Sequence, residues 1–219
     1  MKKVESGTVL VVGLGRFGSA VALELAAADR EILAVEKSPS LVAQWSHRFP
    51  VIEADATNKE ALEQLGARDF SVAVVSIGSS LEASVLTTAN LSELGIPEIW
   101  AKATSRDHGR ILEKIGAHRR VFPEFDAGRR VAHMVAGRMI DFIELDDNFT
   151  IAKMRPPKEI RGFTIGESKV RERYGVNIIG VKAPGQPFEY ASGDSRVGED
   201  DLIIVSGNAG LLDSFAARR

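Results

Sequence analysis

The sequence contains no cysteine, and this absence excludes several kinds of chemistry at once. Without thiols there is no disulfide, no thiolate metal site and no cysteine nucleophile, and a cysteine-free chain fits a reducing compartment. The chain has 219 residues and a hydrophobic composition of 44%, enough for one large domain or two small ones. A core of that size needs no covalent cross-link.

Long apolar runs and an excess of charge are absent as well. No stretch approaches the ~18 uninterrupted apolar residues that span a bilayer, and residues 1–7 lack the apolar core of a secretory signal. We therefore expect a soluble, cytoplasmic protein. The 28 Lys and Arg against 30 Asp and Glu give a net charge of −2, which disfavours nucleic acid as a partner.

The first 120 or so residues alternate short β-rich runs with amphipathic segments. Continuous apolar runs predict strands that are buried on both faces of a parallel sheet. Residues 8–12 form such a run, and further strands are expected at residues 32–35, 51–52, 72–77, 98–102 and 120–122, six in all. Their alternation with helices over short connections predicts an α/β fold with a Rossmann-like doubly wound parallel sheet.

The helices between these strands carry recognisable start and stop signals. Helices are expected over 17–28 and 106–115, and Ser38 followed by Pro39 suits a helix start. Residues 57–60 and 79–82 each have the form of a capping box, and the helix after the second box is expected to end at Gly95.

After Pro123 the pattern changes. Residues 125–140 predict one long helix, with more apolar positions than a free surface helix carries, so we expect an obligate dimer. Strands separated by turn residues follow at 149–154, 176–181 and 202–205, which predicts a small α+β domain. The expected plan is a first domain at 1–124, a linker with a connecting helix at 125–143 and a second domain at 144–219.

A glycine motif lies between the first predicted strand and the first predicted helix. Gly13 permits a tight turn, Gly15 lets a phosphate approach the bare backbone, and Gly18 lets the helix pack close to the strand. Such a turn presents unpaired N–H groups to phosphates. Glu36, 18 residues after Gly18, ends the second predicted strand, where a carboxylate can accept hydrogen bonds from ribose hydroxyls.

Arg16 lies inside this turn and bears on the choice of nucleotide. A guanidinium forms a forked contact with phosphate oxygens, which suits the terminal phosphate of ADP or ATP. The diphosphate of NAD needs no such cation, because the helix N-terminus supplies a positive electrostatic potential and free N–H groups. The residues alone favour an adenine nucleotide over NAD only modestly.

No catalytic constellation accompanies this motif. The four histidines, of which His47 and His108 are expected to be exposed helix residues, share no motif with each other or with carboxylates. No serine lies in a G-x-S-x-G elbow. Binding without chemistry is therefore the simpler interpretation, although an NAD-dependent oxidoreductase remains an alternative.

The sequence also resembles the RCK (regulator of potassium conductance) proteins, and most closely the KtrA/KtrC subfamily related to TrkA. The segments that carry this resemblance cover nearly the whole chain, at residues 12–18, 53–57, 76–78, 86–88, 96–103, 112–117, 122–124, 170–176 and 199–205.

The resemblance implies a regulatory subunit. Such proteins are similar to gating rings, in which homodimers assemble into an octamer under a K⁺-translocating membrane subunit of the KtrB/TrkH kind. ATP and ADP compete for the first domain, and a TrkA-like subunit that senses NAD/NADH is the alternative. The protein would then be peripheral to the inner face of the cell membrane.

The resemblance also implies site residues. The nucleotide would contact Gly13, Gly15, Arg16, Phe17, Gly18, Glu36, Ser38, Asp55, Ala56, Thr57, Ile77, Gly78 and Lys102. Ser38 stands where relatives often have asparagine. Glu124 matches a carboxylate that holds a divalent cation, such as Mg²⁺ or Ca²⁺, between the γ-phosphates of a dimer.

For the second domain the resemblance implies cyclic di-AMP, bound between two protomers. The matching positions are Ile165, Arg171, Asn177 and Ile178. The family's proline in the following hairpin is missing near residues 191–193, a departure that bears on this ligand.

Overall fold

The computed structural model describes residues 7–135, 139–146 and 148–218. The chain divides into two compact units, residues 1–124 and 125–219. Residues 1–6, where no secretory signal is expected, and residues 136–138 of the expected long helix lie outside the described residues. No helix within the described residues combines the length and the apolar character needed to cross a bilayer.

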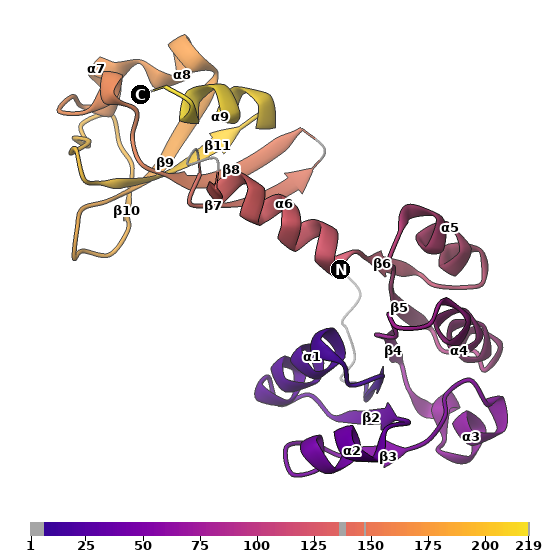
Figure 1. The fold of residues 1–219 in the computed structure, drawn as a ribbon. Helices are drawn as coiled ribbons and strands as arrows, with labels where there is room; N and C mark the ends of the chain where they lie inside the picture. Colours follow the sequence, from indigo (N-terminus) through magenta and orange to yellow (C-terminus); the bar gives the residue numbers. More distant parts are fainter. Residues whose placement is uncertain (1–6, 136–138, 147, 219) are drawn as a thin grey trace. The chain divides into compact units, whose positions relative to one another are not determined.

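The first unit is built on a parallel sheet of six strands in the order β3-β2-β1-β4-β5-β6 (Figure 1). These strands are β1 (Val9–Val12), β2 (Ile32–Glu36), β3 (Val51–Glu53), β4 (Val72–Val75), β5 (Glu98–Lys102) and β6 (Arg119–Val121). The expected doubly wound α/β sheet is confirmed. The strand order reverses between β1 and β4, so the connections after these strands diverge at the carboxyl edge, where such folds bind ligands.

Helices cover both faces of this sheet (Figure 1). They are α1 (Arg16–Ala27), α2 (Pro39–Trp45), α3 (Lys59–Gln64), α4 (Leu81–Glu93) and α5 (Arg106–Lys114), with a 3₁₀ turn η1 (Ala67–Asp69). Leu62, Leu91 and Leu112 of α3, α4 and α5 are fully buried in one core. Ala22 of α1 and Phe49 after α2 belong to the core of the opposite face.

Both expected capping boxes are wrong by one residue. The cap of α3 is Asn58, whose side chain accepts the N–H groups of Glu60 at 2.9 Å and Ala61 at 3.4 Å. The cap of α4 is Ser80, which accepts from the N–H of Ala83 at 3.1 Å. At both caps the extended backbone ends at the later of two adjacent polar residues, so that residue faces the first turn.

Ser38 occupies the N-cap position of α2, but its side chain caps no backbone N–H group. Its Oγ instead lies 2.9 Å from Oγ of Ser40.

The second unit contains an antiparallel sheet of five strands in the order β10-β9-β11-β8-β7. The strands are β7 (Asp141–Asp146), β8 (Phe149–Met154), β9 (Val176–Lys182), β10 (Glu189–Tyr190) and β11 (Leu202–Gly207). The helices are α6 (Pro123–Val135), which enters from the first unit, α7 (Ile165–Ser168), α8 (Val170–Tyr174) and α9 (Ala209–Ala216), with a 3₁₀ turn η2 (Lys158–Ile160). Its core is separate from the cores of the first unit.

The expected helix over 125–140, within the linker 125–143, is partly wrong. Met139 and Ile140 are not helical, and β7 begins at Asp141. The N–H of Ile140 donates to the carbonyl of Lys153 at 2.8 Å, so this segment pairs with β8 instead of extending the helix. Met139 is buried in the second core, which the helical pattern does not reveal.

Candidate nucleotide-binding site

The turn after β1 has the geometry that its glycines suggest. Gly13 adopts φ +89°, a left-handed conformation that a side chain would strain. A Cβ on Gly18 would overlap the carbonyl oxygen of Gly13 and the hydroxyl of Ser76, so α1 packs closely against this turn. A Cβ on Gly15 would meet nothing within 4 Å. The backbone at Gly15 is therefore open to a ligand from that direction.

Glu36 is buried at the end of β2 and holds this turn in place. Its Oε2 accepts from the N–H of Leu14 at 2.7 Å, and its Oε1 accepts from the N–H of Ser38 at 2.9 Å. A carboxylate has about four acceptor positions. Each oxygen therefore keeps acceptor capacity for a further donor, such as a ribose hydroxyl.

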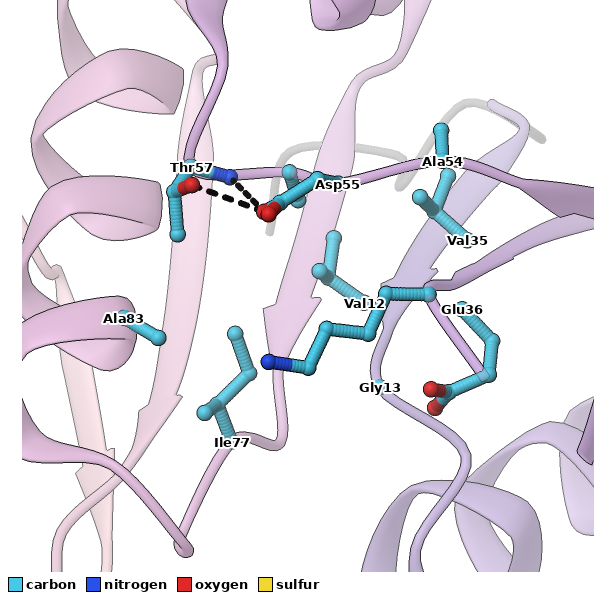
Figure 2. A pocket seen from close by; sticks show the side chains of 11 residues that line it. Val12, Gly13, Val35, Glu36, Ala54, Asp55, Thr57, Ile77 and Ala83 are labelled. Atoms are coloured by element: carbon cyan, nitrogen blue, oxygen red, sulfur yellow. Dashed lines mark hydrogen bonds between the residues drawn. The ribbon is translucent and has the colours of Figure 1, made fainter. Parts of the chain in front are cut away.

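A cavity opens beside Glu36 at the carboxyl edge of the sheet (Figure 2). Six of the residues expected at a nucleotide line it: Gly13, Glu36, Asp55, Ala56, Thr57 and Ile77. Sequence reasoning missed the other lining residues, Val12, Val35, Lys37, Ala54 and Ala83. The remaining expected residues lie outside this lining: Gly15, Arg16, Phe17, Gly18, Ser38, Gly78 and Lys102.

Asp55 follows β3 and is fixed by its own turn. Its Oδ1 accepts from the hydroxyl of Thr57 at 2.7 Å and from the N–H of Thr57 at 2.9 Å, the two bonds drawn in Figure 2. The hydroxyl bond, then the N–H bond and the charge of Lys37, hold the pKa of Asp55 below its usual value. The cavity thus presents a fixed acceptor and, in Lys37, a cation that directly follows Glu36.

A second group of expected residues gathers at the end of β5. Nζ of Lys102 donates to Oε1 of Glu124 at 2.6 Å and lies 6.0 Å from the centroid of the Phe17 ring. A Cβ on Gly78 would lie 3.1 Å from the same Nζ. Arg16, in the first turn of α1, is exposed and has no hydrogen-bond or ion-pair partner among the described residues.

Glu124 does not fit a metal ligand set within one chain. Its carboxylate is engaged by Lys102, and that hydrogen bond, its own backbone N–H and the charges of Lys102 and Arg16 lower its pKa. No group of three or more His, Asp or Glu side chains in the described part of the chain could hold a cation. One carboxylate beside an ammonium leaves most of a coordination shell unfilled.

The histidines are engaged separately. The expectation that His108 is exposed is wrong, because only 1% of it is accessible. Its Nδ1 accepts from the N–H of Thr104 at 3.2 Å, and burial lowers its pKa. His47 is exposed, in the turn after α2. His118 accepts from the N–H of Ile99 at 3.1 Å, and Nδ1 of His133 lies 3.7 Å from Oδ1 of Asp213.

A separate cavity of about 210 Å³ lies in the second unit. The four residues expected at a second ligand, Ile165, Arg171, Asn177 and Ile178, all line it. The lining also contains Gly166, Lys169, Val170 and Glu172, which sequence reasoning missed. Residues from α7, α8 and β9 thus converge on one hollow.

A doubly wound sheet with a glycine turn and a carboxylate at the end of β2, followed by a small antiparallel domain, is the fold of RCK proteins. The chain belongs to the TrkA-N domain family, which matches residues 9–123.

Similar proteins match well beyond that domain. The chain is 33% identical to Ktr system potassium uptake protein A of Bacillus subtilis, over 98% of both chains. It is 31% identical to Ktr system potassium uptake protein C of the same organism, over 95% of both chains.

The fold is similar to that of two solved structures. The GsuK channel bound to NAD matches all of this chain with a TM-score of 0.69 and 20% identity, and the chain spans 41% of that channel's length. This likeness shows the fold alone. The Shewanella denitrificans Kef CTD in AMP-bound form is 27% identical with a TM-score of 0.52, over 59% of this chain and 82% of its own.

Proposed function

We propose that the protein is a cytoplasmic regulatory subunit of a bacterial potassium uptake system of the Ktr/Trk type, and that it is not an enzyme. The observation that carries this proposal is the likeness to two Ktr proteins over both structural units. His108, His118 and the buried Glu36 accept hydrogen bonds from the protein's own backbone, which supports binding rather than acid–base chemistry.

In this proposal ATP and ADP compete for the first unit. The ribose lies against Glu36, the adenine enters the cavity beside Ile77 and Ala83, and the phosphates follow the glycine turn. Arg16 supports a mononucleotide, because its unpaired guanidinium stands in the first turn of α1 and suits a terminal phosphate. Lys102 adds a second cation near the same turn.

One phosphate can act as a switch without hydrolysis. A ligand shifts a conformational equilibrium only through contacts that differ between the states. The γ-phosphate makes such contacts, and ADP lacks it. We propose that homodimers assemble into an octameric ring at the inner face of the membrane, where the nucleotide changes the activity of a K⁺-translocating partner of the KtrB/TrkH kind.

We propose that a divalent cation, Mg²⁺ or Ca²⁺, binds only in the assembled protein. One chain offers a single carboxylate at Glu124, so the remaining ligands would come from a second copy and from phosphates.

For the second unit we propose cyclic di-AMP as the ligand. The convergence of Ile165, Arg171, Asn177 and Ile178 on one cavity supports it. Arg171 offers a phosphate contact and Asn177 a hydrogen-bonding edge for a base.

NAD or NADH is the alternative for the first unit, since Glu36 and the glycine turn accept either kind of nucleotide. An NAD-dependent oxidoreductase is the remaining alternative, which an absorbance assay for NADH oxidation tests directly.

A thermal-shift panel of ATP, ADP, NAD and NADH tests the nucleotide. A ligand at a hundredfold excess over its Kd stabilises the folded state by ~2.7 kcal/mol. We expect ATP and ADP to raise Tm, and Arg16→Gln to weaken ATP more than ADP. Arg48→Gln is the control, because Arg48 is exposed and lies outside this cavity. Stabilisation by NADH alone would contradict the proposal.

Growth at low potassium tests the cellular role. Co-expression with a KtrB-type membrane subunit should restore growth to a strain that lacks its own regulatory subunits. Failure of the wild-type protein with every such subunit tried, despite normal expression, would contradict the regulatory role.

A further inference from the structure

The cavity in the second unit is bordered by two cationic side chains, Lys169 and Arg171. Neither has a hydrogen-bond or ion-pair partner among the described residues. A lysine or arginine that lines a cavity and has no carboxylate partner is available to an anionic ligand.

The other described arginines of this unit are used differently. Six of them lie within 4.0 Å of a carboxylate oxygen: Arg129, Arg130, Arg155, Arg161, Arg173 and Arg218. Lys153 and Lys182 both stack on Phe188. Lys158 is the other described cation of this unit without a partner, and it does not line the cavity. Arg196 donates to the carbonyl oxygen of Gly162, so two of the three described Lys and Arg side chains of this unit without a partner belong to residues that line the cavity.

The backbone of Lys169 gives an independent indication. It links α7 to α8 with φ +46° and ψ +40°, a left-handed conformation that is unfavourable for a residue with a Cβ. The same unit places glycine at comparable turns, at Gly162 with φ +80° and Gly175 with φ +68°. A lysine at a position where glycine fits better points to a use for its side chain.

The lining is not uniformly positive, because Glu172 also borders the cavity. Two cations and one carboxylate leave a net positive charge, and Glu172 and Asn177 add hydrogen-bonding groups. A ligand with phosphates and a nucleobase matches this combination better than a simple anion does.

We propose that Lys169 is a phosphate-binding residue of this cavity, which acts together with Arg171 on a phosphate-bearing nucleotide. This inference rests on the proposal that the second unit binds such a ligand, and it adds a residue that the family resemblance did not supply.

Calorimetric titration of the full-length protein with cyclic di-AMP tests it. Lys169→Gln and Lys169→Gly should each raise Kd about tenfold or more, equivalent to about 1.4 kcal/mol. Lys169→Arg should stay close to wild type. Lys158→Gln is the matched control, because it removes an unpaired charge outside the cavity.

Thermal unfolding of the same variants separates binding from structure. Lys169→Gly should unfold at the wild-type temperature or higher, because glycine relieves the left-handed strain. A purely structural role would give the opposite pattern, a lower Tm with an unchanged Kd, and would overturn the inference.

The two proposals fail in different ways. If wild type and both Lys169 variants bind cyclic di-AMP equally, the role of Lys169 is wrong while the ligand proposal stands. If wild type does not bind cyclic di-AMP, titration with AMP and pyrophosphate tests whether Lys169 binds phosphate. Weaker binding by Lys169→Gln then supports the inference, and equal or absent binding overturns it.

Discussion

Nζ of Lys102 lies 2.6 Å from Oε1 of Glu124, and this ion pair joins the end of β5 to the first turn of α6. The Lys102 side chain is 12% exposed and the Glu124 side chain 62% exposed. Two residues expected at the nucleotide and at a metal are therefore bound to each other. Any ligand that draws Lys102 toward a phosphate must compete with Glu124, which links the site to the start of α6.

Glu124→Gln should lower the free energy of unfolding at pH 7 by about 0–1 kcal/mol, the range of exposed ion pairs. The hydrogen bond from Lys102 lowers the pKa of Glu124 below its usual value of 4.5. The stabilisation is therefore fully present above pH 4.5 and is lost as the pH falls through the lowered pKa.

Urea unfolding at pH 7 and at acid pH measures this difference. Asp126→Asn is the control, since Asp126 is an exposed acid of the same helix. A difference between wild type and Glu124→Gln that persists unchanged in acid would show that the ion pair is not its source.

Gly18→Ala and Gly15→Ala should separate folding from binding. The new Cβ at position 18 overlaps the Gly13 carbonyl and the Ser76 hydroxyl, so we expect a loss of about 1–3 kcal/mol or more of stability. The Cβ at position 15 meets nothing within 4 Å, so Gly15→Ala should fold normally and lose nucleotide affinity. Denaturant unfolding and nucleotide titration check both, and unchanged nucleotide affinity of Gly15→Ala would argue against phosphates at this turn.

The sheet of the first unit could be predicted because its signals are local. The central strands β1 and β4 are short apolar runs bounded by glycine or polar residues, and the glycine pattern after β1 predicts a tight turn there. The sequence predicts the N-caps of α3 and α4 one residue too early. Either of two adjacent polar residues can act as the N-cap, and the backbone conformation selects the second one. Met139 and Ile140 are not helical because pairing of β7 with β8, the next strand in the chain, overrides a helical pattern.

The site was harder to predict than the sheet. Lys37 could have been found, because it follows the acidic end of β2 directly. The Lys102–Glu124 pair could not, since 22 residues separate two groups that only the fold brings together. The sequence predicts an exposed His108 because it lies among the charged residues of an amphipathic helix, whereas the structure buries it on the same helix as Leu112.

Glu36→Gln should weaken both the fold and the nucleotide site. One amide oxygen replaces two carboxylate oxygens, so either the Leu14 or the Ser38 N–H loses its acceptor. A buried donor left unpaired costs about 1–3 kcal/mol. Glu53→Gln is the matched control, because Glu53 is the exposed register partner of Glu36 on β3. Equal stability of the two variants in urea would show that the turn does not depend on Glu36.

His108 should make the stability of the first unit depend on pH near neutrality. Burial lowers its pKa below the usual value of 6.5, so the unfolded chain binds a proton more readily than the folded one. Stability should therefore fall as the pH decreases below about 6.5, by up to about 1.4 kcal/mol per pH unit.

His108→Asn removes the titrating ring and offers an amide oxygen to the N–H of Thr104, which now donates to Nδ1 at 3.2 Å. Unfolding free energies measured between pH 7.5 and 5.5 should then vary less with pH than in wild type. His47→Asn, at an exposed turn, should keep the wild-type dependence. The buried Nε2 of His108 has no described hydrogen-bond partner, so protonation of the ring finds no compensating acceptor. If His108→Asn and wild type show the same pH dependence, another titrating group causes the loss of stability at low pH.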